Sequence, residues 1–102
     1  MKVVKNPIGK AIGLMFASNE KIARGICLAN KKESRCGITT IFCTQSLEMI
    51  FVNSKNVVVD KVILRPWVLS YVPKKPYKYV IESKVSSLNY IYIGDKVNLM
   101  FF

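Results

Sequence analysis

Apolar and polar residues alternate with a period of two over a long segment that begins after Gly37. The apolar members of this series, which would share one face, are Ile41, Cys43, Leu47, Met49 and Phe51. Only Gln45 interrupts the series. Such alternation is typical of a half-buried strand, and it predicts a strand over residues 38–52.

The next segment contains a turn and a second strand. Residues 53–56 read "NSKN", a cluster of turn-forming residues, and are followed by the β-branched run "VVVDKVIL". Asn and Ser favour turns because their side chains bond nearby backbone groups, whereas β-branched residues suit a pleated surface. We therefore predict a hairpin whose second strand covers residues 57–64.

Three further strands are predicted, at residues 26–29, 78–83 and 96–101. The first follows from the brief apolar run "RGICLAN", the second from "YKYVIES", and the last from "KVNLMFF" after the turn Gly94-Asp95. Between the second strand of the hairpin and residue 78 stand Pro66, Pro73 and Pro76. Because proline cannot donate to a sheet ladder, residues 65–76 are expected at an edge or in a loop.

One short helix is predicted near the N-terminus, over residues 7–15. Asn6 can accept hydrogen bonds from free backbone amides, and Pro7 fits the first helical position. Ile8, Ile12 and Met15 fall at helical spacing and are expected to pack on the sheet.

Together these elements predict a mainly β protein, a small antiparallel β-sandwich or barrel with one short N-terminal helix. Strands do not alternate with helices in the manner of a parallel α/β fold. The length of 102 residues predicts a single domain over residues 1–102.

The chain is strongly basic, with 16 Lys and Arg against 6 Asp and Glu and a formal charge of +10. Such a charge attracts anionic ligands and nucleic acid, although a solvated lysine-rich surface kept for solubility has the same composition. No apolar run reaches the roughly 18 residues of a membrane span, and the N-terminus does not resemble a secretory signal. We therefore expect a cytoplasmic protein that does not associate with a membrane.

The chain has three cysteines, Cys27, Cys36 and Cys43, and no histidine. Their spacing does not fit a zinc site, so no metal and no cofactor is expected. We expect all three thiols to be reduced, buried and inert. A Cys27–Cys36 disulfide is the alternative if the source is a hyperthermophile, where intracellular bridges occur.

Catalysis by a Ser-His or Cys-His pair is excluded because the chain has no histidine. Carboxylate chemistry would use Glu48 and Glu82, which lie on predicted strands and could face each other as the acid and base of a hydrolase. The alternative is that each glutamate is a surface partner of a lysine on a neighbouring strand.

Charge and aromatic rings interleave in the segment "YVPKKPYK" at residues 71–78. Single-strand nucleic-acid binders combine cationic and aromatic side chains in this way. The candidate binding residues here are Tyr71, Lys74, Lys75, Tyr77 and Lys78. The alternative is a solvated hairpin tip with no ligand.

Seven short motifs follow one another between residues 7 and 97. They are Gly13-Leu14-Met15-Phe16, Arg24-Gly25 before Ile26, Leu47-Glu48-Met49-Ile50-Phe51, Val58-Val59, Tyr71-Val72-Pro73, Tyr79-Val80-Ile81-Glu82 and Gly94-Asp95-Lys96-Val97. In this order they resemble the bacterial and archaeal family known as domain of unknown function 192. The resemblance implies a compact, mostly β, jelly-roll-like fold and no established activity.

The chain departs from that family pattern in two places. Glu48 stands where the family commonly has Asp, and "IFCTQS" replaces a stretch that commonly contains Pro. If this region shapes a pocket, the pocket in this chain differs or is lost.

The favoured function is a non-enzymatic binding or accessory module for an anionic or small ligand, with no catalytic residues. The first alternative is a weak single-strand nucleic-acid binder that uses the 71–78 segment. The second alternative is a carboxylate-based hydrolase that uses Glu48 and Glu82.

Overall fold

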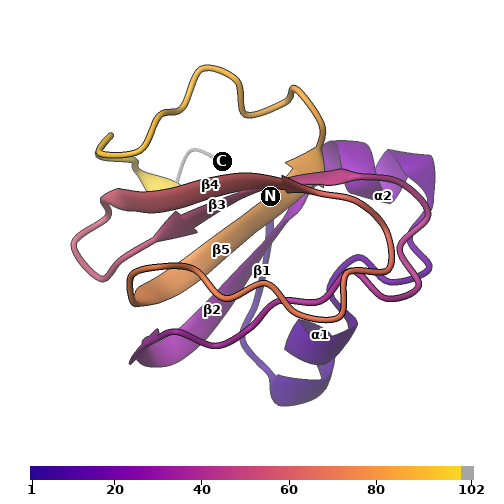
Figure 1. Ribbon diagram of the computed structural model, residues 1–102, viewed down its shortest axis with the longest axis horizontal. Helices are drawn as coiled ribbons and strands as arrows, with labels where there is room; N and C mark the ends of the chain where they lie inside the picture. The colour runs from indigo at the N-terminus through magenta and orange to yellow at the C-terminus, as the bar shows by residue number, and fades with distance from the viewer. Residues whose placement is uncertain (100–102) are drawn as a thin grey trace.

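The computed structural model describes residues 1–99, without the side chains of Pro7, Ala11 and Ile12. Figure 1 shows the strands gathered in one twisted sheet, with the helices beside it. In chain order, the described elements are β1 (Lys2–Val4), α1 (Pro7–Ile12), α2 (Asn19–Arg24), β2 (Ile26–Ser34), β3 (Leu47–Val52), β4 (Val58–Leu64) and β5 (Tyr77–Lys84).

The strand order in the sheet is β1-β2-β5-β3-β4. β1 pairs with β2 in parallel, and the other three pairs are antiparallel. The mainly β prediction is therefore confirmed, but a purely antiparallel sheet is wrong. The parallel pair arises because the chain crosses over through α1 and α2 before it returns as β2. β1 and β4 are edges of an open sheet, so the closure expected of a barrel is not found.

The predicted hairpin is confirmed, since β3 and β4 pair across the 53–56 turn. The Asn53 side chain accepts hydrogen bonds from the backbone of Lys55 and Val57, at 2.9 and 3.0 Å. The strand predicted over 38–52 is wrong over residues 38–46, where Ile38 forms only an isolated bridge with Tyr71. Cys43 is buried in the same cluster as the apolar residues of β3, so irregular packing produced the apparent period of two.

The strand predicted over 96–101 is wrong in its described part. Residues 96–99 are not part of a strand, and Lys96 forms an isolated β-bridge with Val57. The rest of that prediction lies outside the described residues.

The predicted start of α1 is confirmed, because Asn6 caps the helix by accepting a hydrogen bond from the Gly9 amide at 2.6 Å. The helix ends earlier than expected, and Ile8 is 74% exposed rather than packed on the sheet. Met15 is only half-buried, and the packing expected of Ile12 lies outside the described residues. Leu14, just beyond the helix, takes the core position instead. Within residues 1–99 no helix is long and apolar enough to cross a membrane.

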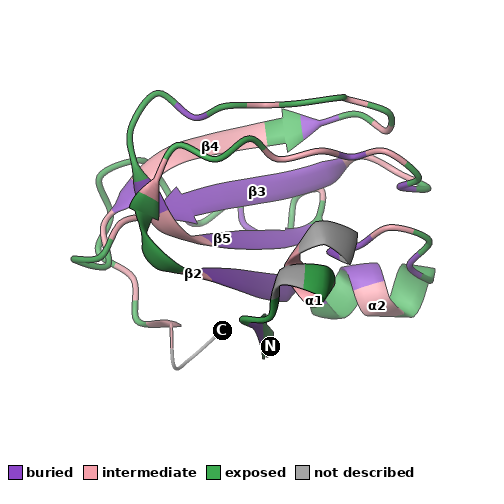
Figure 2. Cartoon of the chain, turned by 90° about the horizontal axis from the view of Figure 1, so that it is seen from below, coloured by how far each residue is buried: buried purple, intermediate pink, exposed green. Residues whose placement is uncertain are grey.

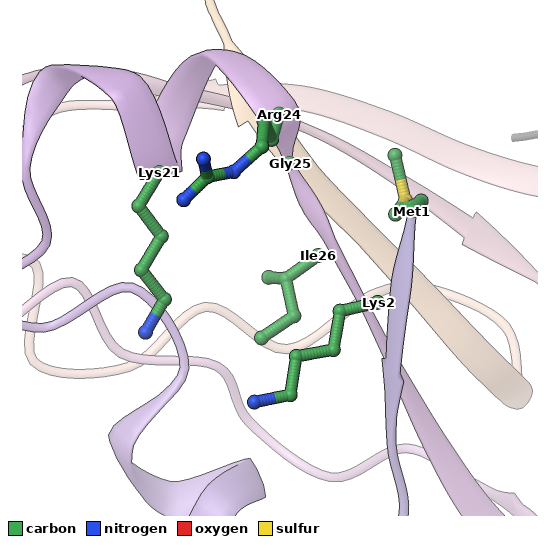
Figure 3. A pocket seen from close by; sticks show the side chains of 6 residues that line it. All are labelled: Met1, Lys2, Lys21, Arg24, Gly25 and Ile26. Carbon is green, nitrogen blue, oxygen red and sulfur yellow. The ribbon is translucent and has the colours of Figure 1, made fainter.

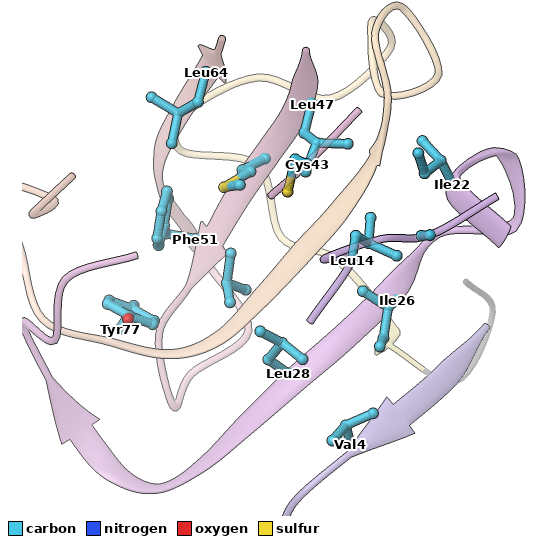
Figure 4. Packing of buried hydrophobic residues seen from close by; sticks show 13 residues of the cluster. Val4, Leu14, Ile22, Ile26, Leu28, Cys43, Leu47, Phe51, Leu64 and Tyr77 are labelled. Atoms are coloured by element: carbon cyan, nitrogen blue, oxygen red, sulfur yellow. The ribbon is translucent and has the colours of Figure 1, made fainter. Parts of the chain in front are cut away.

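Every residue of β3 is buried, so this strand is covered on both faces rather than half-buried (Figure 2). Its alternate residues belong to two separate hydrophobic clusters. The cluster on the helix side contains Leu47, Met49 and Phe51 together with Leu14 and Ile22 (Figure 4). The cluster on the other side is closed by the irregular chain after β5.

An ion pair fastens that irregular chain to the sheet. Lys61 lies 3.8 Å from Oε1 of the buried Glu48, and its ammonium donates to the carbonyls of Leu88 and Ile91, at 2.8 and 2.6 Å. The other carboxylate oxygen of Glu48 accepts a hydrogen bond from the Ser86 amide at 2.8 Å. Glu48 and Lys61 therefore hold the residues that cover one face.

On the helix side, buried Thr40 joins two long loops. Its hydroxyl donates to the Arg65 carbonyl at 2.6 Å and accepts from the Val68 amide at 2.9 Å. The loops end at the surface in an aromatic cluster in which Phe42 contacts Phe16 and Trp67, with ring centroids 4.9 and 4.8 Å apart. All three aromatic residues have positive φ, a rare conformation for such side chains.

We expect Lys61→Met to destabilise the protein by about 3 kcal/mol, because it leaves Glu48 buried without its counter-ion. Urea unfolding of the variant and of the unchanged protein at neutral pH measures this loss of stability. The exposed turn variant Lys55→Met is the control and should change stability by less than about 0.5 kcal/mol. Equal stabilities for the two variants would contradict the assigned role of Lys61.

We expect Thr40→Val to cost about 2 kcal/mol, because the shape is kept while the Arg65 carbonyl and the Val68 amide lose their partner. The same unfolding measurement tests this. A loss below about 0.5 kcal/mol would mean that Thr40 does not join the loops.

Candidate functional site

The tyrosines of the 71–78 segment are not available as stacking platforms. Tyr77 is 1% exposed, and its hydroxyl donates to the Cys36 carbonyl at 2.7 Å. Tyr71 is half-buried against Phe51, and its hydroxyl donates to Asp60 at 2.6 Å. The expectation that both rings could stack on bases is therefore wrong, because the core and the hydrogen bonds hold them.

The lysines of the same segment do not converge on one site with those rings. Lys74 and Lys75 are exposed, whereas Lys78 is half-buried with its ammonium 5.6 Å from the ring of Tyr79. The segment is thus a basic loop, and its tyrosines serve the packing beneath it.

The expectation that Glu48 and Glu82 face each other is also wrong. Glu82 of β5 is in register with Met49 of β3, and Glu48 with Ser83. Because neighbouring residues of a strand point to opposite faces, the two carboxyl groups lie on opposite sides of the sheet. They cannot flank one bond as the acid and base of a hydrolase.

A collection of cations outside the 71–78 segment lies at the start of the chain and around α2. Ser18 caps α2 by accepting a hydrogen bond from the Lys21 amide at 3.2 Å. Lys21 and Arg24 are three residues apart and so share a helix face. On the sheet, Lys2 of β1 is in register with Ile26 of β2, which brings a third cation to the same place.

Gly25 makes this close approach of β1 to α2 possible. Its φ is +73°, and an added Cβ would lie 2.9 Å from the Met1 methyl group and 3.0 Å from the Glu82 carbonyl. A side chain at this position would strain the backbone and would also collide with Met1 and with the backbone of Glu82.

The result is a cavity of about 400 Å³, here called the basic cavity, lined by Met1, Lys2, Lys21, Arg24, Gly25 and Ile26. Figure 3 shows the ends of Lys2, Lys21 and Arg24 around one opening, with Ile26 behind them. In the described part of the chain, none of the three cations forms an ion pair with a carboxylate. The lining thus combines unpaired positive charge with an apolar floor.

Sequence reasoning did not identify these residues. Ser18, which caps α2, and Gly25, which ends it, are helix signals, but the sequence analysis predicted only the helix over residues 7–15. β1 has three residues and no strand pattern of its own. The cavity depends on both elements, so it could not be predicted without them.

The cysteines do not all have the expected environment. Cys27 and Cys43 are buried, and burial raises the pKa of both thiols, that of Cys27 to about 11. Cys36 is exposed, contrary to prediction, and all three are free thiols. Among residues 1–99 no three His, Cys, Asp or Glu side chains gather in a way that could hold a metal ion.

Comparison with known proteins gives a family match over nearly the whole chain and several relatives. Residues 1–99 match the family model DUF192, described as an uncharacterised ACR. A UPF0127 protein of Pyrococcus abyssi is 36% identical over 99 residues, which are 95% of this chain and 83% of that protein. A UPF0127 protein of Thermococcus sibiricus is also 36% identical, over 84% of this chain, which spans 56% of that protein's length.

A solved structure has the same fold. The crystal structure of a protein of unknown function from Novosphingobium aromaticivorans superposes with a TM-score of 0.78 at 19% identity, over 94% of this chain and 71% of that one. At this identity the likeness concerns the fold alone. The match over residues 1–99 and the archaeal relatives confirm the resemblance drawn from the seven motifs: the chain belongs to the DUF192 family, whose curated members are named UPF0127 proteins.

Proposed function

We propose that this chain is a non-enzymatic binding module that holds a small phosphate ester in the basic cavity. The observation that carries the proposal is the convergence of Lys2, Lys21 and Arg24 on one cavity, with no carboxylate of residues 1–99 paired to any of them. Three like charges around one space repel one another, and a dianion placed among them removes that repulsion.

The chemistry of the three cations suits a phosphoryl group. The planar guanidinium of Arg24 can donate two parallel hydrogen bonds to phosphate oxygens, while Lys2 and Lys21 act as point charges. Charge-assisted hydrogen bonds of this kind are roughly twice as strong as neutral ones. Attraction by the formal charge of +10 adds to the rate of encounter with any anion.

The other lining residues favour an ester over the free ion. Ile26 is buried in the floor and Met1 borders the opening, so the cavity offers apolar surface next to the cations. A cavity of about 400 Å³ exceeds the needs of inorganic phosphate and falls within the range of small-molecule sites. A phosphate attached to a small apolar group uses both parts of the lining.

Binding is favoured over catalysis because the two buried carboxylates do not share a site. Glu48 is engaged by Lys61 and Ser86 on the far face of the sheet. Glu82 points to the helix side but does not line the basic cavity. The phosphate ester therefore meets cations and apolar surface without an acid or base from this pair.

The test is a calorimetric titration with phenyl phosphate in 0.15 M salt. We expect saturable binding that is tighter than that of inorganic phosphate, since the phenyl ring covers Ile26. Each single change, Lys2→Gln, Lys21→Gln or Arg24→Gln, should weaken binding about tenfold, because each removes one charge-assisted contact. The variant with all three changes should bind phenyl phosphate at least about a hundredfold more weakly than the unchanged protein.

The matched control removes the same amount of charge from the other basic segment. The variant with Lys74→Gln, Lys75→Gln and Lys78→Gln also loses three positive charges of the formal +10. It should bind phenyl phosphate within about twofold of the unchanged protein, since distant surface charges are screened at this salt concentration. Equal losses in the two triple variants would show only general attraction and would overturn the proposal.

A further inference from the structure

A second cavity system lies between α1 and the sheet. One cavity, of about 110 Å³, is bordered by Glu82, Gly13 and Lys10, and an adjoining one of about 180 Å³ by Lys10, Asn30 and Tyr77. The two adjoin, since they share Lys10, Leu28, Gly37 and Ile38, and together they are here called the α1 cleft. It has no lining residue in common with the basic cavity.

Glu82 is the unusual group in the α1 cleft. It is 4% exposed, and no residue in the described part of the chain donates a hydrogen bond to its carboxyl group or forms an ion pair with it. Burial raises the pKa of this carboxyl group to about 7. An unpaired buried carboxylate is costly, and natural proteins seldom keep one without a partner.

The groups that face Glu82 do not supply that partner. Its register neighbours, Ile26 on β2 and Met49 on β3, are apolar. Cys43 from the 35–46 loop and Tyr77 on β5 are close enough to interact electrostatically with it, but both are neutral at pH 7, with pKa values raised by burial. From α1 comes Lys10, which lines the same cavity without forming an ion pair with Glu82.

Lys10 is held by a hydrogen bond outside Glu82, because its ammonium donates to the Asn30 side chain at 3.0 Å. The Tyr77 hydroxyl, on the same side of the cleft, donates to the Cys36 carbonyl at 2.7 Å. The ammonium group therefore has a fixed place in the cleft while retaining further donor capacity, since an ammonium has three N–H groups.

The carboxyl group also meets the backbone at close range. Gly13 ends α1 with φ +51°, and a Cβ there would lie 3.4 Å from Oε1 of Glu82. The backbone after α1 thus closes over the carboxyl group. The remaining wall contains the apolar side chains of Leu14, Leu28 and Ile38, together with Gly37 and the polar Thr39.

From this arrangement we infer that the α1 cleft binds a small zwitterion of the amino-acid type. The ligand's ammonium group donates to Glu82, its carboxylate accepts from Lys10, and a short aliphatic side chain lies against Leu28 and Ile38. No bond is made or broken in this binding.

Charge matching favours a zwitterion over ligands with a single charge. A simple cation would pair with Glu82 but would be repelled by Lys10. A simple anion would pair with Lys10 but would be repelled by Glu82. A ligand that carries both charges satisfies both residues and adds no net charge to the cleft. Each end gains a charge-assisted hydrogen bond in a site sheltered from water.

The test titrates the protein with L-leucine and with two analogues that each lack one charge, 4-methylpentanoate and 3-methylbutylamine. Amide chemical-shift changes and calorimetry measure the affinity. We expect saturable binding of L-leucine, with shifts at Gly13 and Gly37, and at least tenfold weaker binding of either analogue. Binding should tighten about tenfold from pH 6 to pH 8, because Glu82 loses its proton over this range.

Variants assign the two ends of the ligand. Glu82→Gln should weaken the binding of L-leucine at least tenfold and abolish the pH dependence of that binding. Lys10→Gln should weaken the binding of L-leucine and the binding of 4-methylpentanoate by the same factor. The control is Lys84→Gln, at an exposed residue on the same strand as Glu82, and it should alter neither the affinity for L-leucine nor its pH dependence. No saturation by 20 mM L-leucine, or unchanged binding in Glu82→Gln, would overturn the inference. Phenyl phosphate binding in these variants reports separately on the basic cavity.

The unpaired state of Glu82 can be tested without any ligand. Its pKa rises from the ordinary value of 4.5 to about 7 on folding, so between these values the native state binds more protons than the unfolded state. Stability should therefore fall as the pH rises from 4.5 to above 7, by up to roughly 300-fold in the unfolding equilibrium constant.

Glu82→Gln lacks this titration and keeps the shape of the side chain. We expect the variant to match the unchanged protein near pH 4.5 and to be the more stable of the two at pH 8. Urea unfolding at several pH values measures the difference between the two proteins, in which the other titrating groups cancel. Parallel pH profiles would show that the carboxyl group has a partner in solution.

Discussion

The fold depends on the burial of β3 on both faces. Because all six residues of this strand are buried, covering layers are needed on both sides of the sheet. The two helices have six residues each and cover only part of one side. Irregular segments cover the rest of both sides, and their buried backbone groups need hydrogen-bond partners. Thr40 supplies such partners on the helix side, and Lys61 with Glu48 does so on the other side.

The same constraint gives two glutamates on adjacent strands different chemistry. Glu48 points to the face covered by residues 85–99, where a lysine and a backbone amide meet its carboxylate. Glu82 points to the face covered by α1 and the loops, where its strand neighbours are apolar. One carboxylate therefore holds the covering chain on the sheet, while the other borders a cavity without a partner among the described residues. Residue type alone does not separate these roles, whereas the face of the sheet does.

Local sequence patterns predicted the parts of the fold that depend on local physics. The Asn6 cap, the 53–56 turn and the β-branched run of β4 each work within a few residues, and each was found in place. The family resemblance was likewise carried by short motifs in order.

Features that depend on distant contacts were missed. β1 becomes a strand only because β2 offers it an edge, and β5 enters between β2 and β3 through pairings that no local pattern encodes. Tyr77 looked like an exposed ring in a basic loop, yet its neighbours in space are Phe51 and the Cys36 carbonyl. The two candidate sites have the same origin, since each is assembled by elements far apart in the chain.

Charge composition was a poor guide to where charges pair. The chain has 16 basic and 6 acidic residues, yet the buried Glu82 has no cationic partner among the described residues. Strand register explains this result, because Glu82 lies beside Ile26 and Met49, while Lys2, beyond Ile26 on β1, borders the basic cavity. An excess of lysine raises the field around the whole molecule, but only the backbone geometry decides which carboxylate a lysine can reach. Unpaired cations and an unpaired carboxylate can therefore coexist on one face of the same sheet, in separate cavities.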